Sequence, residues 1–163
     1  MTNEEIAKQV TPEVTNEILD HMMNPRNYGN LEDLNCAGVA YDEQTDEFVS
    51  MYMKIENDII EKISFGTNGC TDTVVAGSIF TEMIKGDTVV NAKIAKNKMM
   101  EKLQHAPEQL RICSTMVLLS CDACWINYEN RQKGNKDELY KMSMQESCQG
   151  LSMPQEEEQN NEQ

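Results

Sequence analysis

The feature of this sequence that most constrains its fold is an uninterrupted succession of two strand-like segments and one helix-like segment. Residues 48–55 and 59–65 predict two strands, because the Glu-Asn-Asp turn between them favours a hairpin. Residues 66–69, which read Gly-Thr-Asn-Gly, predict a turn into a helix over 70–84. A hairpin with helices before and after it is typical of an α+β domain, in which a small antiparallel sheet is covered on one side.

Three further helices are predicted from capping residues, apolar spacing and turn signals. The first is expected over 12–23, because Thr11 and the proline after it suit an N-cap and the first helical position. The others are expected over 90–103 and over about 113–130. The acidic stretch over 31–45, which contains Asn and Gly, predicts a loop.

The chain has 163 residues and a formal net charge of -14, so we expect one domain with its own hydrophobic core. The negative charge argues against nucleic acid and anionic membrane surfaces as partners, because both bind clustered Lys and Arg. The first residues are polar and acidic, unlike a secretory signal, and the longest mostly apolar run, 116–126, is too short to cross a bilayer. These observations predict a cytoplasmic protein.

The end of the chain differs in character from the rest. The last residues read PQEEEQNNEQ and offer no apolar side chain for burial. A segment of this composition is not expected to form a packed structure. We therefore predict a single domain over 1–150 and a disordered acidic tail over 151–163.

Six cysteines are many for a chain of this size, and two of them stand where helices are predicted to begin. In a reducing cytoplasm, cysteines serve as metal ligands, reactive thiols or buried apolar residues more often than as disulfides. Cys70 and Cys113 each open a predicted helix, where partial positive charge and free N–H groups favour the thiolate. Two such thiols on separate helices predict a shared site. Simple burial at the two helix starts is the alternative.

The remaining cysteines have a less direct interpretation. Cys121 and Cys124 are spaced as a CxxC motif, and two thiols at this helical spacing share a face that would suit one ion. They also fall on the apolar stripe of the last predicted helix, so we favour burial in the core. Cys148 lies near the tail and is expected to be a free thiol.

Four segments carry a resemblance to a known family: in order, EILDHMMNPRNYGNLED, FGTNGC, TEMIKG and ICS. In combination they resemble the NifU/IscU family of iron–sulfur cluster assembly scaffolds over residues 14–128. The resemblance implies a compact α+β domain with a small antiparallel three-stranded sheet packed against four or five helices. The third strand is then expected over 36–41 or near the N-terminus.

The family's cluster site uses three cysteines, an aspartate and a histidine, and this sequence matches only part of the set. Cys70 and Cys113 match two of the cysteines, and a gapless count back from Cys70 places Asp46 at the aspartate. The third cysteine position is occupied by Gln44 and the histidine position by Ile112. The resemblance therefore implies a divergent member.

Two residues are candidates to replace the missing ligands. Cys36 lies in the same predicted loop as the missing cysteine position, and loops of this kind tolerate such shifts. The set Cys36, Asp46, Cys70 and Cys113 would offer three thiolates and a carboxylate to an iron–sulfur cluster or to zinc. His105 lies eight residues before Cys113 and is a second candidate.

The resemblance implies a scaffold or carrier that assembles and transfers a transient cluster, most simply [2Fe–2S], and that is not itself an enzyme. Its implied partners are a cysteine desulfurase, which supplies sulfur, and recipient apo iron–sulfur proteins. If Cys36 does not reach the site, Cys70 and Cys113 alone are expected to bridge a homodimer around one cluster. Two alternatives stay open: a zinc-binding sulfur acceptor for a desulfurase, and a degenerate paralogue that only binds proteins.

Overall fold

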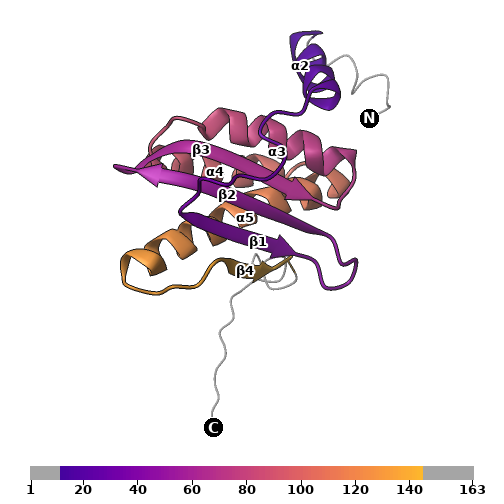
Figure 1. Cartoon of the computed structure of the whole chain (residues 1–163). Coiled ribbons are helices and arrows are strands. Elements are labelled where there is room, and N and C mark those ends of the chain that lie inside the picture. The colour runs from indigo at the N-terminus through magenta and orange to yellow at the C-terminus, as the bar shows by residue number, and fades with distance from the viewer. Residues whose placement is uncertain (1–11, 145–163) are drawn as a thin grey trace.

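A sheet backed by helices forms the body of the molecule, in a computed structural model that describes residues 12–144. Figure 1 shows helices α3, α4 and α5 together on one face of this sheet. In chain order the elements are α2 (Pro12–Met23), β1 (Cys36–Tyr41), β2 (Phe48–Glu56), β3 (Ile59–Thr67), α3 (Thr71–Ile84), α4 (Val89–Leu103), α5 (Glu108–Gln132) and β4 (Tyr140–Ser143). The predicted α+β class is confirmed.

The sheet has four strands in the order β3-β2-β1-β4. The predicted hairpin is present, since β2 pairs with β3 antiparallel, and β1 pairs antiparallel with the other edge of β2. The third strand thus lies at one of the two expected places, over 36–41. The prediction of a loop over 31–45 is wrong for these residues. The prediction of a purely antiparallel, three-stranded sheet is also corrected, because β4 joins β1 in parallel. Four residues that pair only with a strand far earlier in the chain leave little local signal.

The turn after α2 is bound to the edge strand β3 by main-chain hydrogen bonds. The N–H of Phe65 donates to the carbonyl of Asn27, and the N–H of Gly29 donates to the carbonyl of Phe65, both at 2.8 Å. Ser64 Oγ donates to the carbonyl of Gly29 at 2.8 Å. The ring of Tyr28 meets Phe65 edge-on, with ring centres 5.2 Å apart. The Asn-Pro-Arg-Asn segment therefore fixes the end of α2 to the sheet.

Ser78 of α3 fixes α2 from the other side. Its Oγ lies 2.6 Å from Nδ1 of buried His21 and accepts the N–H of Arg26 at 2.8 Å. The guanidinium of Arg26 also pairs with Asp20 within the same segment. Because two groups from this segment meet at one buried hydroxyl, polar contacts hold the end of α2 to α3.

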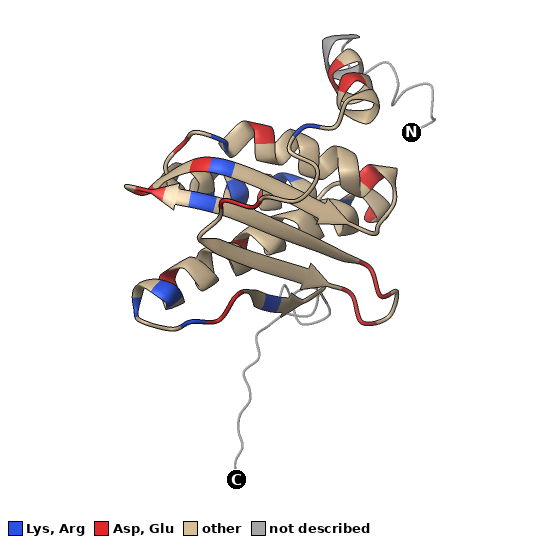
Figure 2. Ribbon diagram, viewed as in Figure 1, with Lys and Arg blue, Asp and Glu red and all other residues tan. Residues whose placement is uncertain are grey.

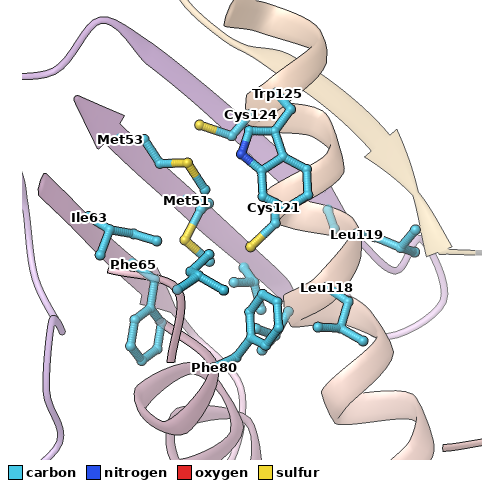
Figure 3. Packing of buried hydrophobic residues seen from close by; sticks show 14 of the residues in the cluster. Met51, Met53, Ile63, Phe65, Phe80, Leu118, Leu119, Cys121, Cys124 and Trp125 are labelled. Atoms are coloured by element: carbon cyan, nitrogen blue, oxygen red, sulfur yellow. The ribbon is translucent and has the colours of Figure 1, made fainter. Parts of the chain in front are cut away.

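The core lies between the sheet and α5, as Figure 3 shows. Alternate side chains of β2 point into the core. This period of two is expected for a strand that has one covered face. Cys121 and Cys124 lie on the buried face of α5 with no exposed surface, so their predicted burial is confirmed. The largest fully buried side chains include Trp125, Phe65, Met51, Met53, Ile55, Ile60, Ile84 and Leu118.

Two glycines let the helices approach the sheet closely. A Cβ on Gly38 of β1 would lie 2.2 Å from the backbone nitrogen of Cys124, so α5 packs directly against the strand backbone. A Cβ on Gly77 of α3 would lie 2.4 Å from the ring of Phe65. These contacts leave no room for any side chain, and together they set the positions of α5 and α3 on the sheet.

Three of the predictions concern residues outside 12–144. The domain boundary at 150, the acidic tail over 151–163 and the free thiol of Cys148 all lie outside the described residues. Within 12–144, none of the helices combines the length and the apolar character needed to span a bilayer.

Replacing Gly38 by Ala should destabilise the fold by about 3 kcal/mol, because the added methyl group meets helix backbone that has no flexible side chain to move. Gly66→Ala is the matched control on β3, where the new methyl group would meet only the hydroxyl of Ser50 at 3.2 Å. That control should change stability by less than about 1 kcal/mol. Urea unfolding followed by circular dichroism measures both, and equal losses would contradict the close approach of α5.

Candidate functional site

Cys70 stands at the start of α3, as predicted. It is the N-cap residue, with φ −77° and ψ 177°, and its side chain is exposed. The turn before it is fixed by Thr67, whose hydroxyl donates to the carbonyl of Phe48 at 2.6 Å and accepts the N–H of Gly69 at 2.9 Å. This turn therefore delivers the thiol to the end of β3, at the open N-terminus of a helix.

Cys113 does not stand at a helix start, and this prediction is wrong. Helix α5 begins five residues earlier, at Glu108, with Pro107 as the N-cap residue. A proline suits a helix start, and a glutamate in the first turn interacts favourably with the positive end of the helix, so the helix extends beyond the cysteine. Cys113 lies in the second turn, and only 5% of it is exposed. Its backbone N–H belongs to the helix interior.

The two sulfur atoms nevertheless converge, with Sγ of Cys70 3.8 Å from Sγ of Cys113. Gln109 lies one helical turn before Cys113, and its Nε2 is 3.3 Å from Sγ of Cys113 and 3.9 Å from Sγ of Cys70. The hydroxyl of Thr73 is 3.9 Å from the sulfur of Cys70. Sequence reasoning missed Gln109, although its spacing of four residues before Cys113 places both side chains on one face once the helix start is known.

The two thiols have opposite shifts in pKa. The N–H groups at the start of α3, that of Thr73 first, lower the pKa of Cys70, although its side chain forms no capping hydrogen bond with them. Burial raises the pKa of Cys113, because a thiolate loses hydration there. The pair therefore combines an exposed thiol that ionises readily with a buried thiol that keeps its proton to higher pH.

An acidic loop lies beside the turn that carries Cys70. Nδ2 of Asn68 donates to the carbonyl of Asp46 at 3.0 Å, and its Oδ1 accepts the N–H of Phe48 at 2.8 Å. Asp46 itself has a φ of 60°, which bends the loop between β1 and β2 at this point. Figure 2 shows acidic residues along this loop, which holds Asp42, Glu43, Asp46 and Glu47. Their field favours cations near this end of the sheet.

The structure does not bring Cys36 to the pair, which corrects the expectation that a loop would deliver it. Cys36 is the first residue of β1, faces Met53 of β2 and has no exposed surface. Its sulfur lies 3.4 Å from Sγ of Cys124 and 3.6 Å from the carbonyl of Met53. Strand pairing draws this cysteine into the core, so it forms a second, buried pair of thiols with α5.

The expected four-residue set is therefore not assembled within residues 12–144. That part of the chain holds no group of three or more His, Cys, Asp or Glu side chains placed to share a metal ion. His105 is exposed in the turn between α4 and α5 and joins no such group. Of the sequence-predicted residues, the structure brings together the thiols of Cys70 and Cys113, with Asp46 in the neighbouring loop.

An apolar pocket of about 400 Å³ borders both helices that carry the thiols. Its lining includes Asp72, two residues after Cys70, and Ser114, the residue after Cys113. Ile18 of α2 and Leu110 of α5 also line it, and both are partly exposed. The pocket is thus lined by close sequence neighbours of both thiols, and the acidic loop is hydrogen-bonded to the turn before Cys70.

Comparison with known protein families matches residues 13–135 to the NifU-like N terminal domain. The chain belongs to this family. A similar curated protein is the "Iron-sulfur cluster assembly scaffold protein IscU" of Aquifex aeolicus, 32% identical over 133 residues, which are 80% of this chain and 84% of that protein. Another, from Archaeoglobus fulgidus, is named "Iron-sulfur cluster assembly scaffold protein IscU 1" and is 28% identical over 84% of this chain and 90% of its own length.

Solved structures agree with this NifU-like fold. The N-terminal part of a nitrogen-fixing NifU-like protein from Brucella abortus superposes with a TM-score of 0.59 at 14% identity, over 71% of this chain and 93% of its own. A structure described as a putative iron–sulfur cluster assembly scaffold for the SUF system of Fervidobacterium islandicum gives a TM-score of 0.56 at 14% identity, over 65% and 91% of the two chains. At these identities the likeness shows the fold.

Iodoacetamide should alkylate Cys70 of this NifU-like domain faster than Cys113. The alkylation rate of Cys70 should also reach half its maximum at a lower pH than that of Cys113. The lowered pKa of Cys70 keeps its thiolate present below the pH at which an ordinary thiol is protonated, whereas the raised pKa of Cys113 delays ionisation. Peptide mapping after alkylation at a series of pH values measures both midpoints. A midpoint for Cys70 at or above that for Cys113 would contradict this assignment.

Cys36→Ala should lower the free energy of unfolding by about 1–2 kcal/mol, since it removes a buried sulfur from the contact between β1 and α5. The same change should leave the alkylation rates of Cys70 and Cys113 unaltered, because Cys36 contacts neither of them. Denaturant unfolding and peptide mapping on one preparation measure both effects. Unchanged stability with slower labelling of Cys70 would place Cys36 at the site after all.

Proposed function

We propose that this NifU-like chain is a scaffold that holds a nascent iron–sulfur cluster on the thiolates of Cys70 and Cys113 and then transfers it. The observation that carries the proposal is the 3.8 Å separation of two sulfur atoms from different helices. Cysteine thiolates are the usual protein ligands of iron–sulfur clusters. The scaffold names of the curated relatives support the same function.

The surroundings of the pair suit a cargo that is held for a short time. Cys70 is exposed, so iron and sulfide reach the site without opening of the core. The acidic loop beside it attracts cations, which raises the local concentration of iron before any bond to sulfur forms. Asp46 of this loop is proposed as an oxygen ligand for iron that arrives first, before thiolates of a second copy complete the four ligands of the cluster. A carboxylate is a harder donor than a thiolate and binds such a centre less tightly, which favours release.

The cluster is proposed to be [2Fe–2S] and to lie between two copies of the chain. A cluster of this type takes four protein ligands. Each chain offers one pair of converging thiols, so two copies supply four. The separation of Cys36 from the pair supports this arrangement, because the third thiol is buried against Cys124. Assembly of the homodimer then depends on the cluster.

The proposed partners follow from the chemistry of the same two thiols. A cysteine desulfurase supplies sulfur as a persulfide, and transfer requires attack by an accessible thiolate. Exposed Cys70, with its lowered pKa, is the proposed acceptor. Apo iron–sulfur proteins are the proposed recipients of the finished cluster. We also propose a cytoplasmic location, where thiols stay reduced.

Anaerobic reconstitution with ferrous iron and sulfide tests the scaffold function. Wild type is expected to turn brown, to bind iron and sulfide in equal amounts and to elute as a dimer that a chelator returns to a monomer. Cys70→Ser and Cys113→Ser should each lower bound iron by at least about tenfold, since even second-sphere changes at metal sites cost about 10–100-fold in affinity. Cys36→Ala is the matched control and should bind iron as wild type does.

Three results would contradict the proposal or one of its parts. A monomer that carries a complete cluster would overturn bridging by two copies. One colourless zinc ion per chain, with no cluster formed, would favour a sulfur acceptor that activates a desulfurase. No metal under any condition, with Cys70→Ser indistinguishable from wild type, would favour a paralogue that only binds other proteins.

A further inference from the structure

The thiols of Cys70 and Cys113 are close enough to react with each other as well as with a metal. Their sulfur atoms are 3.8 Å apart, and a disulfide bond is about 2 Å long. The two thiols differ in access, because Cys70 is exposed and Cys113 is buried to all but 5% of its surface. A pair of this kind, with one thiol open to solvent and a second thiol directly behind it, is suited to reducing a sulfur–sulfur bond in two steps.

We propose that Cys70 and Cys113 together reduce sulfane sulfur, so that the chain itself releases sulfide from a small persulfide. The inference rests on the proposed scaffold function, because it assigns a source of sulfide to the site at which the cluster forms. It goes beyond that function, since holding a cluster requires only two ligands and no transfer of electrons between them.

In the first step the exposed thiol takes up the sulfur. The thiolate of Cys70 attacks the outer sulfur of a persulfide R–S–SH, and a bond forms between that sulfur and Sγ of Cys70. The bond between the two sulfurs of the donor breaks, and R–S⁻ leaves and takes up a proton. Cys113 is shielded by its burial and does not meet the donor directly. The product is a persulfide on Cys70.

In the second step the buried thiol expels sulfide. Sγ of Cys113 attacks the nearest atom, Sγ of Cys70, and the bond from this atom to the outer sulfur breaks. Hydrosulfide leaves and takes up the proton that Cys113 has lost. Each cysteine sulfur gives up one electron, and the released sulfur gains two. The whole reaction converts R–S–SH and two protein thiols into R–SH, H₂S and one disulfide bond. A small thiol such as dithiothreitol then restores the pair.

Two neighbouring features support this assignment. Gln109 donates toward both sulfurs from one amide group, at 3.3 Å and 3.9 Å, and so holds the side chains of the pair toward each other. The pair formed by Cys36 and Cys124 is even closer, at 3.4 Å, but neither residue has exposed surface. Of these two pairs, a persulfide in solution therefore meets only the first, and the second provides an internal control.

The test uses the full-length chain, reduced and free of metal, mixed under anaerobic conditions with one equivalent of glutathione persulfide. Wild type is expected to release about one sulfide per chain at early times, to lose the mass of two hydrogens and to yield a peptide that links Cys70 to Cys113. Cys113→Ser should instead keep one added sulfur atom on Cys70 and release at least about tenfold less sulfide. Cys70→Ser should do neither, and Cys36→Ala should match wild type.

Two results would overturn the inference: a persulfide that persists on Cys70 of the wild type, or equal release of sulfide by wild type and Cys113→Ser. Circular dichroism confirms that each variant is folded. The outcome is separable from that of the scaffold test, because reconstitution there uses added sulfide. A wild type that binds a cluster but does not reduce the persulfide overturns this inference alone. One that reduces the persulfide but binds no cluster overturns the scaffold function alone.

Discussion

Helix α5 lies so close to β1 that the backbone of Cys124 leaves no room for a side chain on Gly38. This contact sets the height of α5 above the sheet, and with it the position of Cys113 near the start of the helix. The contact between Gly77 and the ring of Phe65 does the same for α3 and for Cys70 at its N-cap. The 3.8 Å between the two sulfurs is therefore a consequence of two helix-to-sheet contacts that tolerate no added atom.

The elements with strong local signals were predicted from the sequence within a few residues. The hairpin of β2 and β3 follows from its turn residues, and the helices α2, α3 and α4 begin and end near their predicted bounds. The convergence of Cys70 with Cys113 was also predicted, although by way of a helix start that Cys113 does not occupy. The argument from helix starts therefore holds for only one thiol of the converging pair, since only Cys70 lies at the end of a helix.

The features that were not predicted have a common physical cause, because each depends on tertiary contacts rather than on local sequence. The strand β1 reads Cys-Ala-Gly-Val-Ala-Tyr, and its small residues have little preference for a strand. They are small because α5 packs on them, a fact that local spacing does not contain. The burial of Cys36 and the parallel pairing of β4 depend on the same neighbours. The contact of Gln109 with Cys113 could not be predicted, because it requires a helix that begins at Glu108 and so places both side chains on one face.

Within residues 12–144, two close pairs of thiols differ in the motion that exposes them to solvent. The pair of Cys36 and Cys124 spans the contact between the sheet and α5 and is sealed from solvent. A reagent reaches these sulfurs only when that contact opens, which requires a large part of the fold to come apart. Cys70 is accessible while everything else stays in place. The ratio of the labelling rate of Cys70 to that of Cys36 or Cys124 in one sample thus measures how rarely the contact between the sheet and α5 opens.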